Sequence, residues 1–175
     1  MKRTTILAAL ALAAATALVA AAGAGGKPPK GSPKLSATPV FKLNLRPSQE
    51  VPAIKGLRAD AVGSVTFDLE RTGNTITSGE VIFYFNYAFP GSVTITGLHI
   101  HQGAKGTNGD VVVNSGVTSL ADSDGQGNVT AIVSGVAPAT LQAILDNPRG
   151  YYVNLHTSAN PTGALRDQLH NPKKR

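Results

Sequence analysis

The chain contains no cysteine and no tryptophan, and only one methionine occurs among its 175 residues. Without cysteine it has no disulfide framework, no thiolate for a metal site and no thiol nucleophile. The same absence excludes a lipid anchor attached through cysteine. Stability must therefore come from an ordinary apolar core.

Recognisable catalytic motifs are also missing. The sequence has no Gly-x-Ser-x-Gly elbow and no phosphate-binding loop. The glycine-rich stretch 103–109 precedes a predicted strand, so we interpret it as a turn whose glycines supply positive φ. Residues 122–125 resemble a fragment of a calcium loop but lack its later ligands, and we predict a turn there as well. These absences favour a binding role over an enzyme.

The amino terminus has the layout of a secretory signal peptide. Lys2 and Arg3 precede an almost unbroken run of Ala, Leu and Val over residues 6–22, and small residues follow. The run is short for a membrane anchor, so we expect cleavage near residue 24 and no transmembrane span in the mature protein. Residues 25–39 are rich in Pro, Gly and Lys, which is typical of a stiff, solvated linker.

The net charge of +6 comes from the ends of the chain. Residues 38–171 contain eight basic residues and all ten acidic ones, which gives this stretch a net charge of −2. A folded basic face for nucleic acid is therefore not expected. We divide the sequence into a signal peptide, a linker, one domain and a basic tail, at residues 1–24, 25–39, 40–170 and 171–175.

From residue 40 onward the hydrophobic pattern has a period of two, interrupted by Gly, Asn, Asp and Pro. About eight short strands are predicted, which indicates an all-β sandwich or barrel. They include residues 40–45, 65–70, 80–88, 93–101, 110–114, 128–134, 151–156 and 164–170. Residues 138–147 instead place Leu141, Ile144 and Leu145 at helical spacing, so we predict one short connecting helix there.

The four histidines all lie in the second half of the domain. His99 and His101 are two residues apart, so in a strand they share one face while Leu98 and Ile100 occupy the other. By the same alternation, Tyr152, Asn154 and His156 face away from Val153 and Leu155. In the last strand, Arg166, Gln168 and His170 face away from Leu165 and Leu169.

A His-x-His pair with a third His on a neighbouring strand is a pattern that suits a metal ion. Neutral imidazole is the commonest protein ligand for metals, and a site without thiolates favours copper first, with zinc as the alternative. We predict His99, His101, His156 and His170 as ligands, with Tyr152, Asn154 and Arg166 around them. The competing interpretation is that the histidines serve only as surface polarity or as structural hydrogen-bonding groups.

Three motifs together resemble the CHRD domain family, named after chordin. The first is Gln-Glu-Val-Pro at residues 49–52. The second is Gly-Leu-His-Ile-His-Gln-Gly at residues 97–103, and the third is Tyr-Tyr-Val-Asn-Leu-His-Thr at residues 151–157 followed by Leu-Arg-Asp-Gln-Leu at 165–169. They occur in the family's order over nearly the whole domain. Asp167 and Ala164 depart from the family's usual residues, but neither is a histidine position.

The resemblance implies a Greek-key β-sandwich, immunoglobulin-like or similar to copper/zinc superoxide dismutase. That enzyme also has two histidines flanking one apolar residue and a later strand histidine. The analogy places Arg166 near an anion-guiding arginine. It is incomplete here, because the sequence offers no bridging histidine, no zinc subloop and no disulfide.

We carry three functional hypotheses from the sequence. The first is a secreted or periplasmic protein that binds copper or another divalent metal. The second is a metal-free adhesion or scaffold module of the cell envelope, with an envelope or extracellular protein as its partner. The third is a copper-only enzyme similar to superoxide dismutase.

Overall fold

The computed structural model describes residues 38–172, and the predicted signal peptide, most of the linker and the end of the basic tail lie outside them. In this part of the chain there are nine strands, one α-helix and two short 3-10 helices. They are β1 (Val40–Leu45), η1 (Pro47–Gln49), β2 (Asp60–Thr72), β3 (Thr75–Ala88), β4 (Val93–Gln102), β5 (Val111–Asn114), β6 (Leu120–Asp122), β7 (Gln126–Val133), α1 (Pro138–Asp146), η2 (Pro148–Gly150), β8 (Tyr151–Thr157) and β9 (Leu165–Gln168).

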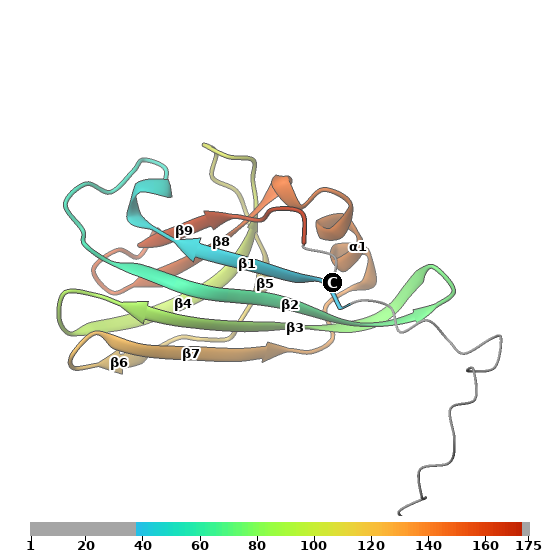
Figure 1. The fold of residues 1–175 in the computed structure, drawn as a ribbon, viewed down its shortest axis with the longest axis horizontal. Coiled ribbons are helices and arrows are strands. Elements are labelled where there is room, and N and C mark those ends of the chain that lie inside the picture. The colour runs from blue at the N-terminus through green and yellow to red at the C-terminus, as the bar shows by residue number, and fades with distance from the viewer. Residues whose placement is uncertain (1–37, 173–175) are drawn as a thin grey trace, which may run out of the picture. The chain divides into compact units, whose positions relative to one another are not determined.

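The strands form two antiparallel sheets, as Figure 1 shows. One sheet has the order β1-β2-β3-β7. The other has the order β5-β4-β8-β9, and β6 pairs with β4 beside β5. The predicted all-β sandwich with one short helix is therefore confirmed.

Alternate residues of both sheets fill the core between them. On β4, Leu98 and Ile100 are fully buried, and on β8 so are Val153 and Leu155. On the core side of the first sheet, the rings of Phe41 on β1 and Phe67 on β2 meet edge to face, with their centroids 5.4 Å apart. On β4 and β8, the period-two pattern thus predicted correctly which residues face the core.

Helix α1 lies within the predicted range and begins at Pro138, as expected of a proline in the first helical turn. Leu141 and Ile144 are its buried residues. A β-carbon on Gly79 of β3 would come 3.0 Å from a methyl of Leu141, so the helix packs closely on that strand.

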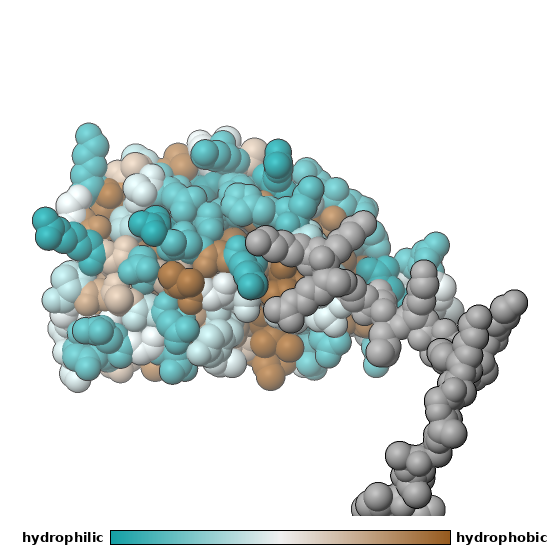
Figure 2. All heavy atoms as spheres, in the orientation of Figure 1, coloured by the Kyte–Doolittle hydropathy of each residue, from teal (hydrophilic) through white to brown (hydrophobic). Residues whose placement is uncertain are grey.

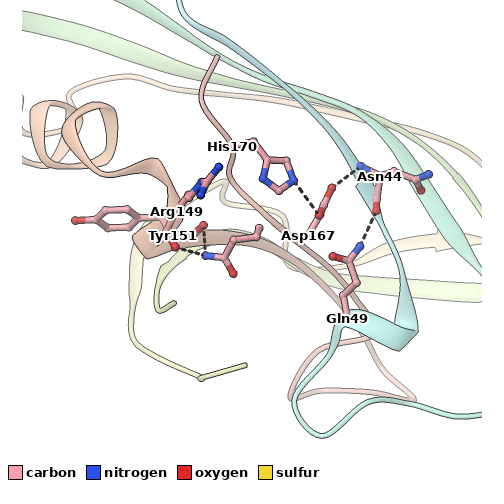
Figure 3. A network of polar contacts seen from close by, with 7 residues as sticks. Asn44, Gln49, Arg149, Tyr151, Asp167 and His170 are labelled. Carbon is pink, nitrogen blue, oxygen red and sulfur yellow. Dashed lines mark hydrogen bonds and ion pairs between the residues drawn. The ribbon is translucent and has the colours of Figure 1, made fainter. Parts of the chain in front are cut away.

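The two sheets are joined along the edge where β1 meets β9. The backbone of Arg46 exchanges two hydrogen bonds with that of Arg166, at 3.0 and 3.2 Å. Beside them, the Asn44 amide donates to Asp167 Oδ2 at 2.8 Å, and Gln49 donates to the Asn44 carbonyl (Figure 3). This edge is consequently closed by hydrogen bonds from both sheets.

The structure differs from the sequence prediction at short elements and strand ends. Strand β6 has three residues and both 3-10 helices have three, too few to produce a periodic pattern. The 122–125 turn is as predicted: Asp122 Oδ1 accepts the amides of Asp124 and Gly125, and Gly125 has a φ of 78°. No helix among residues 38–172 is both long and apolar enough to cross a membrane.

Candidate functional site

Three of the four histidines converge on the outer face of the β4–β8 pair. His99 and His101 lie on β4, and His156 lies on β8. The register places Gly97 opposite His156 and His99 opposite Asn154. Each imidazole offers one nitrogen to a group in which all three atoms lie within 4.8 Å of one another. The predicted shared phase therefore does bring these residues together.

The absence of a side chain at Gly97 gives the cluster its space. A β-carbon there would lie 2.7 Å from Cε1 of His99 and 3.4 Å from Cδ2 of His156. The φ of Gly97 is not positive, so the backbone itself does not require glycine. Sequence reasoning missed this role, although Gly97 stands two residues before His99 on the same face.

Backbone carbonyls fix the tautomers of two of the histidines. His101 Nδ1 lies 3.0 Å from the Gly109 carbonyl, and His156 Nδ1 lies 3.0 Å from the Pro161 carbonyl. Since a carbonyl oxygen can only accept, each neutral ring carries its proton on Nδ1 and donates it there. The lone pair of each ring is then on Nε2.

These two Nε2 atoms face each other at 3.4 Å. With both lone pairs exposed and no proton between them, neutral His101 and His156 form no hydrogen bond to each other. Two nitrogens bound to one ion at about 2.0–2.1 Å in tetrahedral geometry would be about 3.4 Å apart. The spacing thus fits two ligands of a shared metal ion.

The environment favours the neutral form of all three imidazoles. Burial, followed by the neighbouring His156 and His101, lowers the pKa of His99 to about 4. Burial also lowers the pKa values of His101 and His156, although their carbonyl contacts oppose the change. His99 Nδ1 is moreover buried without a hydrogen-bond partner among the described residues. Neutral imidazole is the form that binds metal.

The outer face of this sheet is polar but covered. Arg166 is 2% exposed, and Asn154 and Tyr152 are also 2% exposed. Two stretches lie over them, which we call the 103–109 loop and the 46–59 segment. The loop is tied to the segment by the Asn108 side chain, which donates to the Val51 carbonyl at 2.7 Å. The predicted outward phase is correct, but these residues are buried by loops.

Arg166 holds the 103–109 loop in place. Its guanidinium donates to the carbonyls of Ala104 and Thr107, at 3.3 and 2.8 Å, and to Oδ1 of Asn108 at 3.1 Å. Gln168 adds a hydrogen bond to the Gly103 carbonyl at 2.8 Å. Because this loop carries the Gly109 carbonyl that holds His101, Arg166 acts on the histidine cluster through it.

Tyr152 links Arg166 to the cluster directly. Its ring stacks on His101 at 4.9 Å with an interplanar angle of 10°. Cζ of Arg166 also lies over this ring, 3.4 Å from its centroid, in a cation–π contact. A cation, a phenol and an imidazole are thus stacked, which fixes the plane of the His101 ring.

The loop glycines serve two purposes, only one of which the sequence indicated. Gly106 has the predicted positive φ, at 84°. Gly103 does not, but its β-carbon would lie 2.9 Å from the Tyr152 ring, and one on Gly109 would collide with the Gln102 carbonyl. Close packing, rather than φ, accounts for these two glycines.

Glu50 is a buried residue of the site that the sequence analysis did not select. Asn154 donates to its Oε2 at 3.3 Å, and burial raises its pKa to about 7 despite this bond and the nearby charge of Arg166. Glu50 belongs to the Gln-Glu-Val-Pro motif, whose position in the sequence gave no sign that it folds over β8.

His170, the fourth predicted ligand, lies elsewhere. It follows β9, its side chain is 62% exposed, and its Nε2 is 3.9 Å from Oδ1 of Asp167. Figure 3 shows the ring pointing toward Asp167 at the β1–β9 edge. It is not part of the three-histidine group, and we leave it out of the site below.

Comparison with known proteins identifies one family. The family model described as the CHRD domain matches residues 41–169. No curated protein and no solved structure matches the chain significantly. The likeness to the superoxide dismutase fold therefore stays a prediction.

Proposed function

The chain belongs to the CHRD domain family, and we propose that it is an exported member that binds a divalent metal ion through His99, His101 and His156. The observation that carries the proposal is the 3.4 Å approach of two Nε2 lone pairs whose rings are held by backbone carbonyls. An ion at this place removes the repulsion between the lone pairs. Export rests on the leader-like residues 1–24.

Copper is the first choice of metal. The donor set is three neutral imidazoles without thiolate or carboxylate, and among divalent first-row metals copper binds such nitrogen sites most tightly. Zinc is the alternative, because imidazole also suits it. Tyr152 and the Gly109 carbonyl orient His101, as groups around a metal site commonly do for its ligands. A bound copper ion would supply storage capacity or one-electron chemistry.

The test is the metal content of protein exported by its own leader and purified without a histidine tag, followed by copper and zinc titrations. We expect close to one copper per chain, lost in His99→Ala, His101→Ala and His156→Ala. His170→Ala is the matched control and should retain the metal. Full metal binding by the His99→Ala/His101→Ala double variant would refute the site.

A metal-free envelope module is the second candidate, and it too has a supporting observation. The carbonyl contacts of His101 and His156 tie β4 and β8 to residues 109 and 161, as purely structural histidines would. Its signature is a wild-type protein without metal whose His101→Ala variant is strongly destabilised. Superoxide dismutation ranks third, because the guanidinium of Arg166 is buried and engaged with loop carbonyls.

A further inference from the structure

Strand β7 leaves one long edge of the sandwich open. It is the last strand of the order β1-β2-β3-β7 and pairs with β3 along its whole length. In an antiparallel pair, every second residue directs its N–H and C=O away from the partner strand. Within residues 38–172, the one backbone group of β7 that bonds outside β3 is the Gln126 amide at its first residue, which donates to Asp124 Oδ1 at 3.0 Å. The edge is therefore a free row of donors and acceptors.

The other strand edges in the described region are protected. Strand β1 carries the charged Lys42, and its Asn44 backbone bonds to the side chains of Asp167 and Gln49. Just beyond β1, the backbone of Arg46 bonds to that of Arg166, and β5 and β6 have only four and three residues. Sheet proteins usually guard long edges with a charge, a proline or a bulge. β7 has none of these over its eight residues, Gln-Gly-Asn-Val-Thr-Ala-Ile-Val.

Apolar side chains are exposed beside this edge. Ile132 on β7 is 60% exposed and stands opposite Ile82 of β3, and Tyr84, two residues further along β3, is 44% exposed. Figure 2 shows brown, apolar surface reaching the border of the molecule where β7 runs in Figure 1. A strand added at this edge would cover Ile132.

Charge selects among the strands that could be added. At the Gln126 end of β7, Asp124 accepts the Gln126 amide, and a β-carbon on Gly127 would lie 2.9 Å from Oδ2 of Asp122. A third carboxylate, Asp60, lies in register on β2, two strands away. Near the Val133 end lie three more, Asp68, Glu70 and Glu80, the last bonded to Ser134. Antiparallel pairing of two copies would place the acidic end of one beside the acidic end of the other. The edge therefore disfavours a second copy.

We propose that β7 binds an extended segment of another protein by strand addition, a segment with alternating apolar residues and a lysine or arginine at each end. Main-chain hydrogen bonds supply part of the affinity in this mode of recognition, and side chains on alternate positions supply the specificity. This surface is separate from the histidine cluster, so its test is independent of metal binding.

The experiment uses the complete chain and a capped synthetic peptide, Lys-Thr-Val-Thr-Val-Thr-Val-Lys, with binding followed by amide chemical shifts. We expect saturable shifts concentrated in Gln126–Val133 and at least tenfold weaker binding of the same peptide with Glu at both ends. Ile132→Ser should weaken binding roughly fivefold, because part of an isoleucine is no longer covered. Val62→Ser, which changes a 49%-exposed residue of β2 away from the edge, is the matched control and should bind as the wild type does.

Three results would overturn the proposal. The first is the absence of shifts in β7, or shifts centred on another strand. The second is equal binding of the two peptides, which would remove the charge argument. The third is a change of the β7 amides with protein concentration alone, which would assign the edge to a second copy of the chain.

Discussion

Replacing Gly97 by alanine tests the geometry of the histidine cluster with a single added methyl group. The new β-carbon would lie 2.7 Å from Cε1 of His99. An ordinary contact between carbon atoms is about 3.5 Å, so the ring must move by about 0.8 Å. Metal–ligand distances tolerate only about 0.2 Å, and His99 therefore leaves its binding position.

The expected result is a 10- to 100-fold loss of copper affinity, the range known for groups that orient metal ligands. This corresponds to about 1.4–2.8 kcal/mol of binding free energy. Folding should be little affected, because the φ of Gly97 is available to alanine and the obstructing atoms are side-chain tips. Competition titration against a copper chelator measures the first quantity, and thermal unfolding of the metal-free protein measures the second.

Gly91→Ala is the matched control, since a β-carbon at Gly91 meets no atom within 4 Å. It should leave copper affinity and stability unchanged. Wild-type affinity in Gly97→Ala would mean that the His99 ring is not held where the structure places it, and the reasoning from the cluster geometry would fail.

Three further predictions concern the surroundings of the cluster. In the metal-free protein, the pKa of His99 is about 4 when folded, so protonation of this residue favours the unfolded chain and the free energy of unfolding decreases from pH 6.5 toward pH 4. In urea unfolding, His99→Gln should make this decrease about 2 kcal/mol smaller. An unchanged dependence of the unfolding free energy on pH would contradict the prediction. Glu50 has the opposite pH dependence, because its pKa is raised from 4.5 to about 7 on folding: stability falls as the pH rises from about 4.5 to 7 and changes no further above that. Glu50→Gln should therefore be nearly neutral at pH 4 and stabilise the protein by about 2 kcal/mol at pH 8. An equal effect at both pH values would argue against a buried acid. Tyr152→Leu removes the ring that stacks on His101 and should weaken copper binding about tenfold. Tyr152→Phe keeps the ring and should keep the copper affinity. A similar loss of affinity in both variants would show that the phenol hydroxyl, rather than the stacking, is what matters.

The sequence predicted the arrangement of the candidate residues well where a single strand determines it. His99 and His101 share a face because strand alternation is local, and the same rule separated Tyr152, Asn154 and His156 from the core. That β4 and β8 are neighbours required a pairing between segments about fifty residues apart. Only the likeness to a known family indicated it, since periodicity cannot give strand order.

The parts of the site that the sequence did not predict are non-local. The Gly109 and Pro161 carbonyls that fix the histidine tautomers belong to loops, whose paths depend on the folded sheets beneath them. The burial of Arg166 was missed for the same reason, because a strand pattern does not predict that the 103–109 loop covers this residue. His170 has the right alternation but follows the last residue of β9, and alternation gives no direction to a side chain beyond the end of its strand.

The covered polar face gives this protein two interiors that are built from the same strands. Odd and even positions of β4 and β8 contribute to different layers, Leu98 and Val153 to the apolar one and His99 and Tyr152 to the polar one. Alternate residues of these strands therefore serve different purposes: one set packs in the apolar core, and the other set forms the histidine cluster and its surroundings. A substitution at the polar positions can therefore change the histidine cluster while the apolar positions that hold the sheets together stay the same. Conversely, the apolar residues can be exchanged for other apolar residues without moving the histidines, provided that the register of β4 on β8 is preserved.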